Sequence, residues 1–207
     1  MKHELAEAHP RRADPVWENE VYGKGSFVRC PYDQIATFVF RNLPSKPRHQ
    51  TRILEIGCGP GNNLMFLSQE GFDVAGTDAS PKAIEYARCR LGGAADLKVA
   101  EFPELPFSDE AFDLVVERNA ILCVPFEVGK ATIAEVRRVL RPNGRFLFIP
   151  SSERQQAVDY YTCNYTRDMV EESLRGWRIL QLHHDSTVDA LSGAVVIAEW
   201  RVWAQRS

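Results

Sequence analysis

Short apolar runs alternate with amphipathic segments from Thr51 onward. Each run is mostly apolar and rich in β-formers, as strands buried on both faces of a parallel sheet are. Strands are expected at 53–56, 74–77, 96–99, 112–116 and 145–149. This order predicts a doubly wound α/β fold, in which helices cover both faces of a parallel sheet.

Helix signals stand between the expected strands. Ser80 can cap a helix that has Pro81 at its first position, and Gly92 stops it. A second helix follows from the spacing of Ile133, Val136 and Leu140, with Pro142-Asn143-Gly144 as its stop. Further helices are expected at 31–40 and 167–174, with a connection at 44–47.

The last part of the chain shows a different pattern. Two β-rich segments, 177–182 and 194–203, flank Leu191-Ser192-Gly193. This arrangement predicts a closing antiparallel hairpin. We therefore expect one domain over 1–207, made of an N-terminal part (1–45), a core (51–150) and a final part (151–207).

Composition excludes several classes of partner. The net charge of −3 over 207 residues gives no reason to expect nucleic acid. The cysteines number five with no C-x-x-C spacing, which argues against disulfides and against a metal site. Neither an export signal nor eighteen consecutive apolar residues are present, so we expect no membrane association and a cytoplasmic location. A monomer or a homodimer remains open.

The segment 55–61 reads Glu-Ile-Gly-Cys-Gly-Pro-Gly and carries the main chemical signal. It is a glycine-rich turn that leaves a strand and opens a helix, where the backbone can approach a ligand closely. A dinucleotide-binding turn has G-x-G-x-x-G, whereas here the third glycine comes one residue earlier. The carboxylate of Glu55 would repel a pyrophosphate but would hold an ammonium group. S-adenosylmethionine carries such a group and no phosphate.

This motif resembles that of class I S-adenosylmethionine-dependent methyltransferases. The segments 100–107, 112–116 and 138–145 are similar to further motifs of the family, so the resemblance covers about 51–149. It implies a Rossmann-like, mostly parallel, seven-stranded sheet, with S-adenosylmethionine as cofactor. It is nearest to small-molecule methyltransferases, and a sugar or secondary metabolite is a possible acceptor. A protein or RNA methyltransferase and a non-catalytic S-adenosylmethionine-binding protein remain as alternatives.

Several residues are candidates for cofactor binding. Asp78 ends the second strand, where it can accept the ribose hydroxyls or instead cap the next helix. By resemblance, Glu101 would face the adenine amino group and the Phe102 backbone would reach the ring. Cys58 is expected inside the turn because a small residue fits there. The full set is Glu55, Gly57, Cys58, Gly59, Gly61, Asp78, Ala79, Glu101, Phe102 and Glu117.

The acceptor side is less defined. Glu117 and Asn119 follow the fourth strand, at the edge that open α/β sheets use for ligands, and are weak catalytic candidates. His183 and His184 must face opposite ways on a late strand and are expected to be structural or solvated. Cys123 is expected to pack in the core. The segment 17–26 has no helical or strand period, yet holds Trp17 and Tyr22. We interpret it as a mobile lid over the acceptor, the alternative being a frayed terminus pinned by one tryptophan.

Overall fold

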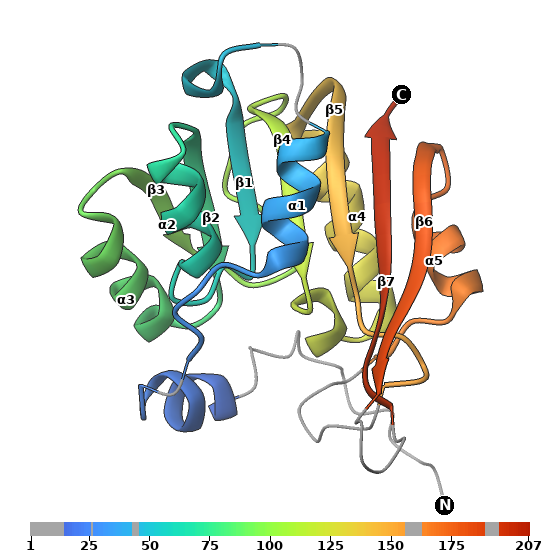
Figure 1. Cartoon of the computed structure of the whole chain (residues 1–207), viewed down its shortest axis with the longest axis horizontal. Helices are drawn as coiled ribbons and strands as arrows, with labels where there is room; N and C mark the ends of the chain where they lie inside the picture. The colour runs from blue at the N-terminus through green and yellow to red at the C-terminus, as the bar shows by residue number, and fades with distance from the viewer. Residues whose placement is uncertain (1–14, 26, 43–45, 156–162, 189–194) are drawn as a thin grey trace, which may run out of the picture.

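A seven-stranded sheet forms the centre of the computed structural model (Figure 1), which describes residues 15–25, 27–42, 46–155, 163–188 and 195–207. The strand order is β3-β2-β1-β4-β5-β7-β6. Strands β1 to β5 are mutually parallel, and β7 runs antiparallel to both of its neighbours. The strands are β1 (Arg52–Ile56), β2 (Asp73–Asp78), β3 (Ala95–Val99), β4 (Phe112–Arg118), β5 (Leu140–Ile149), β6 (Trp177–Val188) and β7 (Val195–Arg206). The predicted mostly parallel sheet and C-terminal antiparallel hairpin are confirmed.

Helices cover both faces of this sheet. The helices are α1 (Asp33–Arg41), α2 (Asn62–Gln69), α3 (Pro81–Leu91), α4 (Phe126–Val139) and α5 (Arg167–Ser173). Buried side chains of α1, α2 and α3 share one core cluster, and those of α4 and α5 share the other. Figure 1 shows α1 and α2 in front of the strands and α4 behind them.

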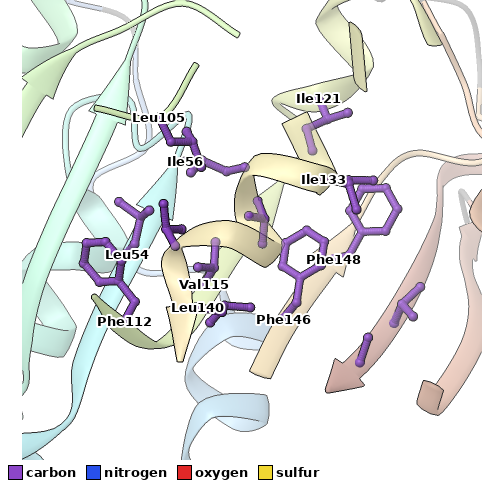
Figure 2. Packing of buried hydrophobic residues seen from close by; sticks show 14 of the residues in the cluster. Leu54, Ile56, Leu105, Phe112, Val115, Ile121, Ile133, Leu140, Phe146 and Phe148 are labelled. Atoms are coloured by element: carbon purple, nitrogen blue, oxygen red, sulfur yellow. The ribbon is translucent and has the colours of Figure 1, made fainter. Parts of the chain in front are cut away.

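Alternation along each strand divides its side chains between the two clusters. On β1, Ile53 packs with α1 to α3, whereas Leu54 and Ile56 pack with α4 and α5. Phe146 and Phe148 of β5 point to the second cluster, where Figure 2 shows them near Ile133 of α4. Successive strand residues face opposite sides, so a fully apolar strand serves both cores.

The structure corrects several expected boundaries. Helix α4 begins at Phe126, and β5 begins at Leu140, so residues 142–144 do not form the predicted stop between them. These residues belong to a bulge, because the pairing shifts from Phe112↔Leu140 to Leu114↔Arg145. The hairpin strands β6 and β7 extend beyond the expected ranges, while residues 191–193 and 44–45 lie outside the described residues.

The N-terminal segment departs from its predicted conformation. Trp17–Tyr22 forms a short π-helical stretch, although no helical period was visible in the sequence. Its residues pack against α3 and the glycine turn, so tertiary contacts fix a conformation that amphipathic patterning does not encode. Within the described ranges, the helices are all too short or too polar to cross a bilayer.

Candidate functional site

A cavity of about 320 Å³ opens at the carboxyl ends of β1, β2 and β4. Strand β1 lies between β2 and β4, so the strand order reverses direction at this point. Open α/β sheets bind ligands at such a switch point. Eleven predicted site residues line the cavity: Trp17, Tyr22, Glu55, Gly57, Cys58, Gly59, Asp78, Ala79, Glu101, Phe102 and Asn119. Gly61 and Glu117 are not among the lining residues.

The glycines of the turn have different roles. Gly57 and Gly59 line the cavity and have φ values of +66° and +52°, which favour glycine. A Cβ on Gly57 would lie 2.1 Å from the Cβ of Ala120. Gly61 instead faces α3, where a Cβ would meet Ala87 at 3.1 Å. Thus two glycines expose the backbone to the cavity, and the third allows two helices to pack closely.

Asp78 holds the glycine turn in place. Its Oδ2 accepts a hydrogen bond from the Gly59 backbone N–H at 2.9 Å, and its Oδ1 accepts one from the Ser80 N–H at 2.9 Å. Ser80 is the N-cap of α3, as predicted, and accepts from the Ala83 N–H. Burial raises the pKa of Asp78, and these N–H donors oppose that shift. Each carboxylate oxygen has a second acceptor site, so Asp78 can still accept hydrogen bonds from a ligand.

Glu55 lies at the end of β1 with an incomplete set of partners. The Asn63 side-chain N–H donates to Oε1 at 2.6 Å, whereas Oε2 is buried without a hydrogen-bond partner. Burial raises the pKa of Glu55 to about 8, with the Asn63 hydrogen bond opposing the shift. An unpaired buried carboxyl at a cavity wall is suited to bind a cationic group.

Glu117 serves the local backbone and does not face the cavity. Its Oε1 accepts the Ala120 and Ile121 N–H groups at 2.7 and 2.9 Å, and the residue has no exposed surface. Burial raises its pKa to about 7. Glu117, predicted as a cofactor-binding residue, is not among the residues that line the cavity, because alternation on β4 turns its side chain beneath the turn that follows.

The cavity contains residues that the sequence analysis did not propose. Tyr32, Asn63 and Arg118 line it, as does Cys123, which was expected to be only a packing residue. Of these residues, only Arg118 could have been found from the sequence, because it directly follows Glu117 at the predicted edge of the sheet. Tyr32 and Asn63 reach the site through contacts between segments far apart in sequence.

The N-terminal stretch forms one wall of the same cavity. Trp17 and Tyr22 both line it, and the Tyr22 hydroxyl lies 3.0 Å from where a Cβ on Gly59 would stand. Glu18 accepts hydrogen bonds from the Ser80 side chain and from the Lys82 N–H, at the start of α3. In Figure 1 the dark-blue helical stretch lies below the carboxyl end of β1. The segment therefore lies over the glycine turn and also forms part of the cavity wall.

The late histidines are outside this cavity. His184 Nε2 lies 2.9 Å from Ser152 Oγ, and its ring packs edge-on against Trp200. His183, one position earlier on β6, is exposed. Neither histidine lines the cavity, so His184 is packed against its neighbours and His183 is solvated.

Comparison with known proteins finds that part of this chain is similar to methyltransferases. A model of the methyltransferase domain matches residues 53–144. YodH, an uncharacterised methyltransferase of Bacillus subtilis, is 29% identical over 144 residues, 63% of this chain and 60% of the relative. A probable phthiotriol/phenolphthiotriol dimycocerosates methyltransferase of Mycobacterium ulcerans is 36% identical over 102 residues, 47% of this chain and 38% of the relative. This chain thus spans less than two thirds of either relative.

The fold gives a second, independent likeness. The crystal structure of a SAM-dependent methyltransferase from Methanosarcina mazei superposes with a TM-score of 0.69 at 19% identity, covering 86% of this chain and 98% of the other. The matched residues 53–144 contain the glycine turn, which lies at the switch point of the strand order. Residues 53–144 thus match a methyltransferase domain, and the fold of the chain is similar to that of a SAM-dependent methyltransferase.

Proposed function

We propose that this protein transfers the methyl group of S-adenosylmethionine to a small-molecule acceptor. The observation that carries the proposal is the pairing of a Cβ-free turn with an unpartnered carboxyl oxygen on Glu55. The turn lets the backbone approach a ligand, and the carboxyl selects an ammonium group over a phosphate.

The residues of the cavity fit this cofactor. Glu55 would hold the ammonium group, and Asp78 would accept hydrogen bonds from the ribose hydroxyls while keeping its bonds to Gly59 and Ser80. Glu101 and Phe102 lie at the cavity wall beyond β3, where the adenine would bind. These assignments rest on side-chain chemistry and on position along the sheet edge.

The chain contributes mainly orientation to the reaction. When bound, S-adenosylmethionine supplies a methyl group made electrophilic by its sulfonium. The carboxylates and the glycine turn would fix the position of that methyl group, so that an acceptor can approach in line. Trp17 and Tyr22 would cover the site and exclude water, which strengthens electrostatic interactions inside it.

A general base is not assigned. Asn119 lines the cavity but cannot take a proton, and its side-chain oxygen accepts a hydrogen bond from the Ser151 hydroxyl. Glu117 could titrate near neutral pH but its side chain points away. An acceptor that ionises readily, or a neutral amine, would need little help from a base.

A small acceptor is favoured over a macromolecule by three observations. Apolar side chains, among them Phe27, Val28 and Val124, line part of the cavity, as is common in pockets for small ligands. The overall charge is negative, which does not favour binding to RNA. One relative is named for a phthiotriol-type acceptor, which is not a protein or a nucleic acid.

Calorimetry with the purified protein tests the cofactor proposal. S-adenosylhomocysteine, the demethylated product, is expected to bind in the micromolar range, and NAD is expected not to bind. NAD binding without a response to S-adenosylhomocysteine would overturn the proposal, because the turn and Glu55 are argued to disfavour a pyrophosphate.

A further inference from the structure

Two groups with unsatisfied hydrogen-bonding atoms, a carboxyl and a guanidinium, belong to the wall of the cavity. In the described part of the chain, Glu55 Oε2 and Arg118 Nε are buried without a hydrogen-bond partner. Glu55 pairs in register with Val116, and Arg118 is two residues further along β4. Residues two apart on a strand point to the same face. Glu55 and Arg118 therefore face the same side of neighbouring strand ends, and Arg118 acts to lower the pKa of Glu55.

Arg118 has hydrogen-bonding capacity to spare. Its side chain is only 13% exposed, and its guanidinium donates no hydrogen bond to any residue in the described ranges. Its ion pair with Glu199 joins Nη2 and Oε2 at 3.7 Å, which is too long for a hydrogen bond. The other oxygen of Glu199 accepts from Gln34 at 3.1 Å and from Arg201 at 3.0 Å. A buried guanidinium in this state has an ion-pair partner but still has N–H groups free to donate hydrogen bonds to a ligand.

A rigid framework links the two groups. The centre of the Arg118 guanidinium lies 3.7 Å from the centroid of the Tyr32 ring, so stacking orients its plane. Asn63 Oδ1 accepts from the Tyr32 backbone N–H at 2.9 Å, while Asn63 Nδ2 donates to Glu55. Asn63 thereby connects the carboxyl of Glu55 on β1 to Tyr32, and the ring of Tyr32 stacks on the guanidinium of Arg118 on β4.

We propose that Arg118 binds the carboxylate of the cofactor's amino-acid group while Glu55 binds its ammonium. The two groups of an amino acid sit on one carbon, and they match the two unsatisfied side chains that share this face of the sheet. Arg118 is the only lysine, arginine or histidine among the described residues that line the cavity. Without it, the nearby carboxylates Glu55 and Asp78 would repel the cofactor carboxylate. This inference rests on the proposed function and adds a positioning role for Arg118.

Arg118 could instead bind a carboxylate of the methyl acceptor. Binding measurements distinguish this ligand from the cofactor carboxylate. The probes are S-adenosylhomocysteine and 5′-methylthioadenosine, which has no amino-acid group. In Arg118→Gln, the affinity for S-adenosylhomocysteine should fall about 10- to 100-fold, because a charge-assisted hydrogen bond is lost. The affinity for 5′-methylthioadenosine should change by less than about twofold. The adenosine and thioether that it shares with S-adenosylhomocysteine are not expected to contact Arg118.

Two further variants sharpen the test. Arg118→Lys keeps the charge but loses the bidentate geometry, so it should bind S-adenosylhomocysteine with an intermediate affinity. Arg201→Gln is the matched control, because it makes the same charge change beside Glu199 but does not line the cavity. It should leave the affinity for both probes unchanged.

Each remaining outcome decides the proposal. Unchanged S-adenosylhomocysteine affinity in Arg118→Gln would overturn it, and a raised acceptor KM in that variant would then assign Arg118 to the acceptor. Equal losses for both probes would also overturn it and indicate a structural role. If Arg118→Gln does not fold, a loss in Arg118→Lys confined to S-adenosylhomocysteine supports the proposal, and no loss overturns it. Failure of the wild type to bind S-adenosylhomocysteine would instead refute the proposed function.

Discussion

Replacing Glu55 by glutamine tests how the buried carboxyl takes part in ligand binding. Glutamine keeps the shape and can still accept from Asn63, but it cannot become negative. In the free protein the pKa of Glu55 is raised to about 8 by burial, so near neutral pH most molecules carry it protonated. Pairing with an ammonium group requires the charged form, so binding must release a proton.

The size of the effect depends on pH. With a pKa of about 8, ionising Glu55 costs about 3 kcal/mol at pH 6 and less than about 0.5 kcal/mol at pH 8. A charge-assisted hydrogen bond contributes roughly 1.5 to 3 kcal/mol. Glu55→Gln should therefore weaken S-adenosylhomocysteine binding about 5- to 70-fold at pH 8. At pH 6 the two proteins should bind almost equally, because ionisation then offsets the gain.

Calorimetry in buffers of different ionisation enthalpy measures both quantities. The wild type is expected to release close to one proton at pH 7, and its affinity should rise roughly tenfold per pH unit below pH 8. Asp78 also has a raised pKa but is present in both proteins, so the difference between them reports Glu55. Equal proton release by the wild type and Glu55→Gln would refute the assignment of Glu55 to the ammonium.

Three other substitutions test separate parts of the site. Gly57→Ala should lower the melting temperature by several degrees, because its Cβ would overlap Ala120 at a positive φ; an unchanged thermal scan would contradict this packing. Asp78→Ala should weaken S-adenosylhomocysteine binding about 10- to 100-fold, and crystallography should show a shifted glycine turn; normal affinity would exclude Asp78 from the ribose site. Glu18→Gln should make Lys24 more accessible to trypsin and weaken binding less than about fivefold, because a partly exposed link to Ser80 is lost; unchanged cleavage would show that Glu18 does not hold the segment down.

The free protein offers an independent check on Glu55. Its folded pKa is raised above the value of 4.5 that applies in the unfolded chain. The folded state therefore binds the proton more strongly, and the resulting stability is fully present below pH 4.5 and is lost as pH rises through about 8. Thermal unfolding without ligand should show wild type losing stability relative to Glu55→Gln between pH 5 and pH 8. Parallel pH profiles would mean that Glu55 is not buried as described.

Local patterns predicted the features that depend on few residues. The strand-turn-helix at 55–61 could be recognised because positive φ values and close packing both require glycine. Ser80 and Asp78 were recognisable because helix caps and strand ends have fixed positions in the chain. The doubly wound α/β fold class followed from the alternation of element types.

Features that depend on distant contacts could not be predicted in the same way. The link from Glu55 through Asn63 to Tyr32 joins three segments, and no spacing in the sequence encodes it. The sequence could not show that Glu117 lies outside the cavity lining, because the facing of a strand-end side chain depends on register, and the apolar residues before it on β4 are buried on both faces. Pro142-Asn143-Gly144 was interpreted as a turn that ends a helix, but it lies in the bulge opposite Asp113, and these residue types are common in both structures.

Transfer of a labelled methyl group tests the central claim most directly. The intact protein is incubated with S-adenosylmethionine carrying a heavy-isotope methyl group and with separate pools of small metabolites, proteins and RNA. We predict that S-adenosylhomocysteine accumulates and that the label appears in one or a few species of the metabolite pool, with Asp78→Ala much slower. Label found only in protein or RNA would contradict the small-molecule proposal, and binding of the cofactor with no transfer to any pool would contradict the proposed activity.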